Sequence, residues 1–365
     1  MSDRLELTTA GGRCLIDFGA ARPVLGERLA VRPASQPVLI LSDSNVQRLH
    51  GAAFADWPCL VLPPGEAGKT LAQAERVYRA LYAAGHDKRS LLVGIGGGAV
   101  TDLCGFVAAT YQRGLGCGLV PTTLLAQVDA AIGGKNAVNL DLAKNLVGTI
   151  RQPDFIIIDP AFNRTLPLAE LQSGLGELVK YAILAGGGLA SRVEAFAASL
   201  ATAARTQHSA QPWAALADEP LATRLAALVR EAAGYKAAVV MADEHEQGRR
   251  RLLNLGHTLG HALELSEGLS HGLAVIKGLY FSLRYSSHLG FLPPEAAARL
   301  ESSLAATGVD ASYSTPADTI CDLVGHDKKK AGHSLDFVFV AGPGQVFSQA
   351  VELDRLRAFL RSDRP

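Results

Sequence analysis

Two histidines spaced four residues apart, His257 and His261, lie in a segment that also carries Arg250 and Asn254. On one helix these four side chains would form a single stripe, because residues three or four positions apart share a helix face. A stripe of one cation, one amide and two imidazoles suits a metal ion or a phosphate group better than it suits solvent. Thr258 stands where a His-Glu-x-x-His protease motif has its glutamate, so the pattern disfavours a metalloprotease.

Three further residues can complete such a site. His271 follows His261 by ten residues, and Glu177 and Lys180 share a helix face at i and i+3. A carboxylate with two of the three histidines would make a three-ligand zinc site with an open coordination position, which is the arrangement for catalysis. Spacing alone does not decide between that site and an ordinary helix surface, where His pairs and Glu–Lys pairs also occur.

A glycine-rich turn indicates a nucleotide site. The string Gly-Ile-Gly-Gly-Gly-Ala at 94–99 follows a predicted strand and opens a predicted helix, as in the dinucleotide fingerprint. The acidic residue expected about 20 positions later is missing, because 113–121 holds no carboxylate, so an ordinary Rossmann dehydrogenase is not well supported. Asp43 and Glu66 are the candidates to bind the ribose instead, although either can be an ordinary loop carboxylate.

The elements that must position these residues change in character near residue 160. Before it, buried strands predicted at 37–42, 91–95, 118–121 and 155–158 and a helix at 70–84 indicate an α/β domain with a Rossmann-like parallel sheet. After it, amphipathic stretches without intervening strands predict a mainly α-helical C-terminal domain. These stretches are 168–184, 188–206, 220–240, 251–265, 271–289 and 294–306, with Gln211-Pro212 predicted to lie in a loop.

The composition excludes several classes of partner. The chain has 365 residues, enough for two domains, and 35 basic residues balance 35 acidic ones. This balance predicts no nucleic acid and no membrane partner, so an anionic ligand must be held by a local cluster of cations. The N-terminus lacks a signal-peptide pattern, no apolar run approaches the roughly 20 residues of a membrane span, and five cysteines without paired spacing predict free thiols in the cytoplasm.

Several longer strings together resemble the 3-dehydroquinate synthases, a family of sugar phosphate cyclases. The string Leu-Leu-Asn-Leu-Gly-His-Thr-Leu-Gly-His at 252–261 is the most informative of them. The other segments that carry the resemblance are 96–114, 120–129, 133–139, 144–148, 165–167, 242–244, 262–264, 271–272 and 327–329. They occur in order from about residue 37 to 340, which makes the resemblance far more specific than any one motif.

The resemblance implies a dehydroquinate synthase-like fold, with an NAD-binding α/β domain at 1–160 and a metal- and substrate-binding helical domain at 161–365. Zn²⁺ or Co²⁺ would be held by Glu177, His257 and His271. NAD would contact Asp43, Asn45, Glu66, Lys69, Gly97, Gly98, Asp102, Thr122, Thr123, Leu125, Asp129, Lys144, Phe162, Thr165 and Leu166. Substrate would contact Arg113, Lys135, Asn145, Lys180, Lys236, Arg250, Asn254, His261 and Lys329.

The same resemblance implies the reaction. The family converts 3-deoxy-arabino-heptulosonate 7-phosphate to 3-dehydroquinate and phosphate, in the shikimate pathway of aromatic amino acid biosynthesis. This lyase reaction runs through transient oxidation by NAD, phosphate elimination, re-reduction and an intramolecular aldol closure. The implied catalytic residues are Asp129, Lys135, Lys180, Lys236, Arg250, Asn254 and His261. His261 would serve the phosphate rather than the metal, and Arg113 would reach the phosphate site of a partner subunit, which predicts a homodimer.

The chain departs from the family pattern at Leu273, where a glutamate is usual after the zinc histidine, and more mildly at Asn136 and Ala143. A glutamate that orients a metal ligand would be lost at 273, which would weaken or tune the site. Three rival functions are considered: a cyclase acting on sedoheptulose 7-phosphate, a polyol dehydrogenase of similar architecture, and a non-catalytic binding homologue.

Overall fold

The computed structural model describes residues 3–141, 143–206, 219–326 and 334–363. Its contacts divide the chain into two compact units, Met1–Leu166 with Val229–His245, and Pro167–Leu228 with Glu246–Pro365. The structure thus differs from the single expected boundary at residue 160, because 229–245 belongs to the first unit. Glu244 holds this segment there by accepting hydrogen bonds from the Thr9 hydroxyl (2.6 Å) and the Gly11 N–H (2.9 Å).

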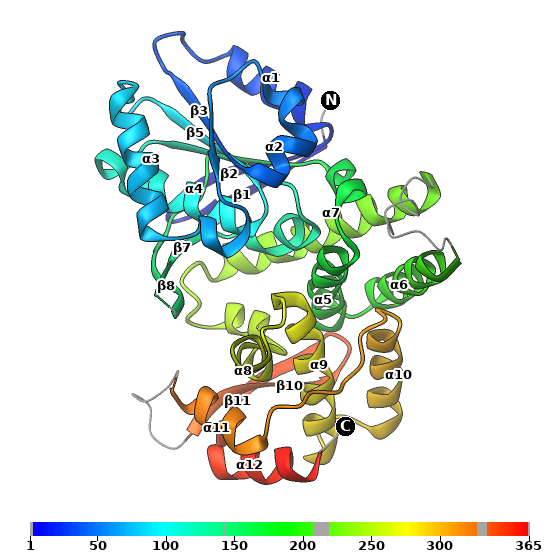
Figure 1. Cartoon of the computed structure of the whole chain (residues 1–365). Helices are drawn as coiled ribbons and strands as arrows, with labels where there is room; N and C mark the ends of the chain where they lie inside the picture. The colour runs from blue at the N-terminus through cyan, green and yellow to red at the C-terminus, as the bar shows by residue number, and fades with distance from the viewer. Residues whose placement is uncertain (1–2, 142, 207–218, 327–333, 364–365) are drawn as a thin grey trace. The chain divides into compact units, whose positions relative to one another are not determined.

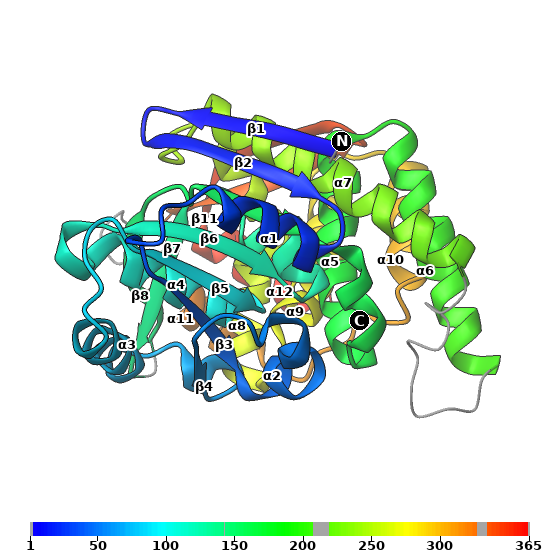
Figure 2. The same ribbon diagram turned by 90° about the horizontal axis from the view of Figure 1, so that it is seen from above.

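The first unit is built on a seven-stranded sheet (Figures 1 and 2). Two strands at one edge form an antiparallel hairpin, and all other neighbours pair in parallel. In spatial order the strands are β1 (Asp3–Thr9), β2 (Gly12–Phe18), β9 (Phe155–Ile158), β6 (Gly116–Pro121), β5 (Leu91–Gly96), β3 (Val38–Asp43) and β4 (Cys59–Leu62). The four strands predicted from the sequence are present, whereas β1, β2 and β4 were not predicted.

The strand order indicates where a ligand can bind. From β3 onward the chain places its parallel strands in the order β4-β3-β5-β6-β9, a doubly wound arrangement. In such sheets ligands bind beyond the carboxyl ends of the strands, at the point where the winding reverses. That point lies between β3 and β5, which end at Asp43 and Gly96. The glycine-rich turn therefore stands at the switch point.

Helices cover both faces of this sheet, which explains why β5 and β9 are buried along their whole length. The helices of the first unit are α1 (Ala21–Ala30), α2 (Ser44–His50), α3 (Leu71–Ala83), α4 (Gly98–Thr110) and the second half of α7 (Glu219–Ala242). A separate hairpin of β7 (Lys135–Leu140) and β8 (Ala143–Ile150), which was not predicted, packs against α4. The helix predicted at 70–84 is α3.

The second unit is mainly helical, as predicted, and also contains one hairpin that the sequence pattern did not indicate. Its elements are α5 (Leu168–Ala185), α6 (Gly188–Thr206), the first part of α7, α8 (His257–Glu267), α9 (His271–His288), α10 (Pro294–Ala305), α11 (Ala317–His326), β10 (Ser334–Gly342), β11 (Gln345–Glu352) and α12 (Leu353–Ser362). An aromatic core joins α9, the hairpin and α12 through Tyr285, Phe337 and Phe359. The loop predicted around Gln211-Pro212 lies outside the described residues.

The prediction of one helix over 251–265 is wrong. Arg249–Asn254 forms a 3₁₀ helix, and α8 begins only at His257. Between them Gly256 has a φ of 80°, a left-handed conformation that ends the first helix and redirects the chain. Arg250 and Asn254 consequently do not share a helix with the two histidines, so the predicted four-residue stripe does not exist.

Helix α9 packs against α5 and α8 at glycine contacts. A Cβ atom added to Gly272 would stand 1.8 Å from the carbonyl oxygen of Ser173 in α5. One added to Gly278 would stand 1.8 Å from the carbonyl oxygen of Gly256, directly before α8. The backbones are therefore too close to accommodate any side chain. Because α5, α8 and α9 carry the predicted metal ligands, this packing sets the distances between those ligands.

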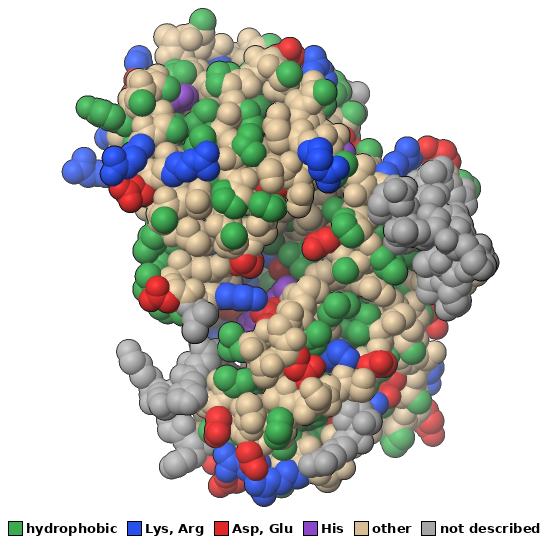
Figure 3. Space-filling model, viewed as in Figure 1, with side chains coloured by type: hydrophobic (Ala, Val, Ile, Leu, Met, Phe, Trp, Pro, Cys, Tyr) green, Lys and Arg blue, Asp and Glu red, His purple; other side chains and the backbone are tan. Residues whose placement is uncertain are grey.

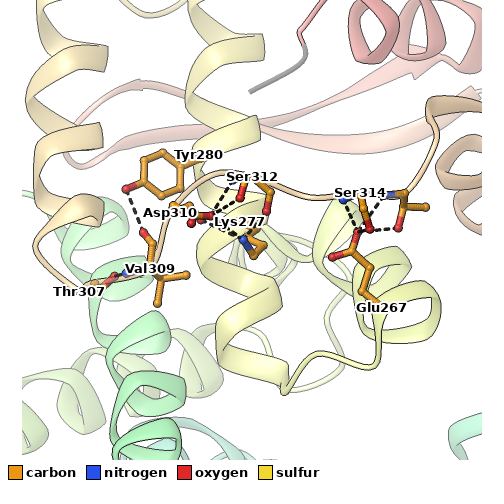
Figure 4. Close-up of polar contacts among 9 residues, drawn as sticks. Glu267, Lys277, Tyr280, Thr307, Val309, Asp310, Ser312 and Ser314 are labelled. Atoms are coloured by element: carbon orange, nitrogen blue, oxygen red, sulfur yellow. Dashed lines mark hydrogen bonds and ion pairs between the residues drawn. The ribbon is translucent and has the colours of Figure 1, made fainter.

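The loop between α10 and α11 ties α8 to α9 (Figure 4). Lys277 of α9 forms an ion pair with Asp310 of this loop at 3.0 Å. Glu267, the last residue of α8, accepts four hydrogen bonds of 2.6–3.1 Å from the backbone N–H groups and hydroxyls of Ser314 and Thr315. These bonds lower the pKa of Glu267 although burial opposes them. The loop thus restrains both helices of the α8–α9 pair.

The surface agrees with the neutral composition. Basic and acidic side chains are interspersed over the face in Figure 3. Among the described helices, none combines the length and the apolar character that crossing a membrane requires.

Gly278→Ala is expected to destabilise the protein by about 1–3 kcal/mol, because the new methyl group must push apart two backbones. The matched control is Gly325→Ala in α11, where the added Cβ would meet only Leu353 Cδ1 at 3.7 Å. Alanine is the better helix former, so the control should be neutral or stabilising. Urea denaturation measures both variants, and equal stability of Gly278→Ala and the wild type would contradict the close packing.

Candidate active site

In the first unit, two predicted cofactor residues mark the strand ends at the switch point. Asp43 ends β3, and its Oδ1 accepts hydrogen bonds from the backbone N–H groups of Asn45 (2.8 Å) and Val46 (3.0 Å). Gly97 precedes α4 without any side-chain cap, which leaves the first N–H groups of α4 available to an anion. A Cβ added to Gly97 would lie 3.0 Å from Thr123 Cγ2, so the turn after β5 packs tightly on the turn after β6.

A polar network lies beside this turn. Lys69 is only 5 % exposed, and its ammonium group forms an ion pair with Asp102 of α4 and donates to Asn145 Oδ1 at 2.5 Å. Burial raises the pKa of Asp102, and Lys69 opposes that rise. Glu66 accepts a hydrogen bond of 2.5 Å from Asn139. The structure therefore brings Glu66, Lys69, Asp102 and Asn145 into one region. The family resemblance implied NAD contacts for the first three and a substrate contact for Asn145, and Glu66 was also a ribose candidate from the residues alone.

A second ion pair joins Asp129 to Lys236. Asp129 lies in a π-helical turn, Ala126–Ala130, and its Oδ1 is 2.6 Å from Lys236 Nζ. Lys236 also donates to the Asp129 carbonyl at 2.7 Å and is 7 % exposed. Single π-turns are frequent at functional sites. The second half of α7 thus supplies a buried lysine to the first unit.

The remaining predicted residues of the first unit follow other strand ends or lie on the β7–β8 hairpin. Thr122, buried after β6, donates its N–H to the Gly96 carbonyl at 2.9 Å. Thr165 follows β9 and lies 2.9 Å from His50 Nε2. Gly98 and Leu125 lie near each other. Phe162 and Leu166 are buried after β9. Lys135 and Lys144 are exposed on the hairpin.

Arg113 stands apart on a strained turn at the end of α4. Gln112 and Arg113 have φ angles of 49° and 67°, a left-handed conformation that costs non-glycine residues energy. The Arg113 side chain is exposed. Lys329, by contrast, lies outside the described residues.

In the second unit, α5, α8 and α9 converge on a cluster of metal-ligand type. Glu177 Oε1 is 3.7 Å from His257 Nε2 and 3.4 Å from His271 Nε2. Ligand atoms of His257, His261 and His271 also lie within 4.8 Å of one another. Donors bound tetrahedrally to one zinc at about 2.1 Å are roughly 3.4 Å apart, so the donor set fits a divalent ion.

Burial and ring distances distinguish the three histidines, among which spacing left the choice of two ligands open. His261 is exposed, and its ring centroid is 6.1 Å from that of His271 and 5.3 Å from that of His257, whereas the His257 and His271 centroids are 5.1 Å apart. Glu177 is fully buried, and its Oε1 lies within 3.7 Å of Nε2 of both His257 and His271. The arrangement favours Glu177, His257 and His271 as the inner set, with His261 on its solvent side.

Electrostatics within this cluster are strong. Glu177 and Lys180 form an ion pair at 0 % and 1 % side-chain exposure. Burial lowers the pKa of His257, and Lys180 lowers it further, so this imidazole is neutral and able to ligate. Burial also acts to lower the pKa of His271, but hydrogen bonds to Glu177 and Glu264 outweigh it and raise that pKa to about 10.

The 3₁₀ helix before α8 supplies two more predicted residues. Arg250 is 2 % exposed, and Asn254 donates to Glu246 Oε1 at 2.8 Å. The contact of Glu264 with His271 received no role in the sequence analysis. The sequence did indicate that Glu264 lies near the histidines, because it follows His257 by seven residues and therefore shares its face of α8.

Solved structures with this architecture define the class of fold. The structure of 2-deoxy-scyllo-inosose synthase complexed with carbaglucose-6-phosphate, NAD+ and Co²⁺ matches with a TM-score of 0.81 at 23% identity, covering 99% of both chains. That of 2-epi-5-epi-valiolone synthase from Streptomyces hygroscopicus subsp. jinggangensis, with NAD+ and Zn²⁺ bound, matches with a TM-score of 0.80 at 24% identity, covering 99% of this chain and 98% of the other. The chain has the fold of these synthases.

Sequence comparison narrows the class to one family. Residues 59–173 match the family model 3-dehydroquinate synthase N-terminal, and 174–330 match 3-dehydroquinate synthase C-terminal. The 3-dehydroquinate synthase of Latilactobacillus sakei subsp. sakei is 39% identical over 98% of this chain and 97% of its own length. The 3-dehydroquinate synthase of a Bradyrhizobium species is 35% identical over 99% of this chain and 96% of its own length. The chain belongs to the 3-dehydroquinate synthase family, which confirms the resemblance and the predicted fold class.

Lys69→Met is expected to destabilise the first unit by about 3 kcal/mol, because it leaves the Asp102 carboxylate without its cation in a buried position. The double variant Lys69→Met/Asp102→Leu should recover most of that loss, since a well-packed apolar pair replaces a buried ion pair at little cost. Urea denaturation of both variants provides the test. A double variant less stable than Lys69→Met alone would contradict this account of the pair.

Proposed function

We propose that the chain catalyses the reaction of its family, the conversion of 3-deoxy-arabino-heptulosonate 7-phosphate to 3-dehydroquinate and phosphate. The observation that carries the proposal is the cluster of Glu177, His257 and His271, which suits one divalent ion with a coordination position left for substrate. The family assignment over nearly the whole chain supports the same reaction. Free thiols at all five cysteines are consistent with a cytoplasmic protein.

The inner ligand set would hold Zn²⁺ or Co²⁺, the ions present in two structures with this fold. When bound, the ion supplies Lewis acidity that favours ionised substrate oxygens. Lys180 stands next to Glu177 as a buried cation, which would attract the developing negative charge of substrate. His261, on the solvent side, would contact the phosphate group.

NAD would lie along the carboxyl ends of the parallel strands. When bound, NAD supplies a hydride acceptor and later returns the hydride, so no net oxidation results. The N–H groups at Gly97 and Gly98 would bind its diphosphate, and Asp43 is the acidic residue nearest the switch point. Around them would lie Asn45, Glu66, Lys69, Asp102, Thr122, Thr123, Leu125, Asp129, Lys144, Phe162, Thr165 and Leu166.

Cations and amides would bind the substrate phosphate and carboxylate. The neutral chain has no global attraction for anions, so these contacts must be local and charge-assisted. Lys236 is held in place by Asp129, and Arg250 by its buried setting. The full proposed set is Arg113, Lys135, Asn145, Lys180, Lys236, Arg250, Asn254, His261 and Lys329, with Asp129 arranging Lys236.

The direct test is a phosphate-release assay with the heptulosonate phosphate, with and without a chelator and with and without added NAD. Phosphate release that needs both metal and NAD, without accumulating NADH, supports the proposal. Preference for sedoheptulose 7-phosphate would indicate another cyclase, and accumulating NADH would indicate a polyol dehydrogenase. Binding without turnover of either sugar phosphate would indicate a non-catalytic homologue.

His257→Ala is expected to reduce phosphate release to the level of the chelator-treated wild type, because it removes one of three metal ligands, while the circular dichroism spectrum stays unchanged. His288→Ala is the control, since this histidine of α9 packs on Phe359 at a centroid distance of 4.8 Å and, among the residues that the structure describes, contacts none of the proposed metal ligands. Wild-type activity in His257→Ala would refute the metal assignment.

We further propose a homodimer in which Arg113 completes the phosphate site of the partner. Its exposed side chain on a strained turn supports this role, because strain is retained where function needs it. Arg113→Ala alone should lower phosphate release. When the Arg113→Ala variant is mixed with the inactive His257→Ala variant and the subunits exchange, part of the activity should return. Each mixed dimer then has one intact site, with His257 from one subunit and Arg113 from the other. A mixture with no recovery would contradict the shared site.

A further inference from the structure

His271 is held by a carboxylate on the helix before it. Its Nδ1 lies 2.5 Å from Glu264 Oε1, and the Glu264 side chain is only 7 % exposed. A carboxylate can only accept in such a bond, so Nδ1 carries the proton and donates it. The contact is short and charge-assisted, which makes it both strong and directional.

This bond determines which ring nitrogen faces the cluster. With Nδ1 donating to Glu264, the other nitrogen, Nε2, points toward Glu177 and lies 3.4 Å from its Oε1. A histidine ligates a metal through a nitrogen lone pair, and its second nitrogen commonly donates to a carboxylate that fixes the tautomer and the ring orientation. The pair of Glu264 and His271 has this arrangement.

The local fold brings the two residues together. Glu264 lies on the face of α8 that carries His257 and His261, at spacings i, i+4 and i+7. Gly268, with a φ of 66°, ends α8 in a left-handed turn, so that α9 can begin with His271 only three residues later. The N–H of the next residue in α9 bonds to the Ser173 hydroxyl of α5 at 3.1 Å. The backbone at the start of α9 is thus anchored separately from the ring.

We propose that Glu264 is the positioning residue of the metal site: it orients His271 so that Nε2 can ligate the divalent ion. This inference rests on the metal site of the proposed function. It also bears on the departure at Leu273, whose side chain has no carboxylate. The carboxylate that contacts Nδ1 of His271 comes from α8, seven residues before the histidine in the chain.

A purely structural role is the alternative, in which Glu264 only joins α8 to α9. Glu267 provides a matched comparison, because it is a carboxylate on the same helix, three residues on, that also crosslinks the α8–α9 region. It bonds to the loop between α10 and α11 and to none of the proposed ligands among its described contacts. Metal affinity and stability therefore distinguish the two roles.

The experiment measures Zn²⁺ affinity of the purified full-length protein by competition with a chromophoric chelator, together with melting temperature. Glu264→Ala should bind Zn²⁺ about 10–100-fold more weakly than the wild type, as expected for loss of a carboxylate behind a ligating histidine. The Zn²⁺ affinity of Glu264→Gln should lie between those of Glu264→Ala and the wild type, because its amide oxygen still accepts a hydrogen bond from Nδ1 but carries no charge. Glu267→Ala should lose stability and keep its Zn²⁺ affinity.

Unchanged Zn²⁺ affinity in Glu264→Ala, or an equal loss in Glu267→Ala, would overturn the positioning role. His257→Ala is measured in parallel to separate this failure from a failure of the proposed function. If His257→Ala also binds Zn²⁺ like the wild type, the metal site itself is refuted. If only His257→Ala loses affinity, the metal site stands and the inference about Glu264 is refuted.

Discussion

A fully buried carboxylate is the constraint on which the second unit depends. Removing Glu177 from water costs several kcal/mol unless cations and hydrogen-bond donors surround it. Lys180 provides one cation from the same helix, and two imidazoles approach within 3.4–3.7 Å from other helices. The same surroundings that make the carboxylate tolerable would suit the metal-ligand role proposed for it. Burial and the proposed function therefore impose one requirement, the convergence of three helices on one point.

Glycines make that convergence possible. Helix α9 meets α5 at Gly272 and approaches α8 at Gly278, where no side chain would fit between the backbones. Ordinary helix packing keeps axes 8–10 Å apart, and glycine contacts bring them to the short end of such distances. Imidazole and carboxylate side chains are short, so helices that carry them must come close. The apolar and aromatic core behind α9 then supports this geometry.

Sequence reasoning predicted the elements whose residues are uniformly apolar or strictly periodic. The strand at 91–95 and the helix at 188–206 were found because burial on all sides or an apolar stripe leaves a local pattern. The hairpin strands β7 and β8 were missed because their exposed faces dilute that pattern. The break at Gly256 was missed because a left-handed glycine inside an apolar stretch resembles a helical one in sequence.

The candidate site was predictable in its residue types and less so in its pairings. Spacing alone could not decide which two of His257, His261 and His271 would join a carboxylate. Glu177 lies 80 residues before His257, on another helix. Only the relatives' motifs linked them before the structure was available. The contact of Glu264 with His271 depends on the turn at Gly268 and on how α9 then packs against α8, and helix spacing alone does not specify that packing.

The buried lysines are paired because a buried charge without a partner would be costly. Lys69, Lys180 and Lys236 each pair with a carboxylate inside their own unit, so no net charge accumulates. A carboxylate that ligates a divalent ion has less charge left to offer its lysine, because both cations compete for the same oxygens. Metal bound at Glu177 would thus strengthen the field that Lys180 presents to an anion.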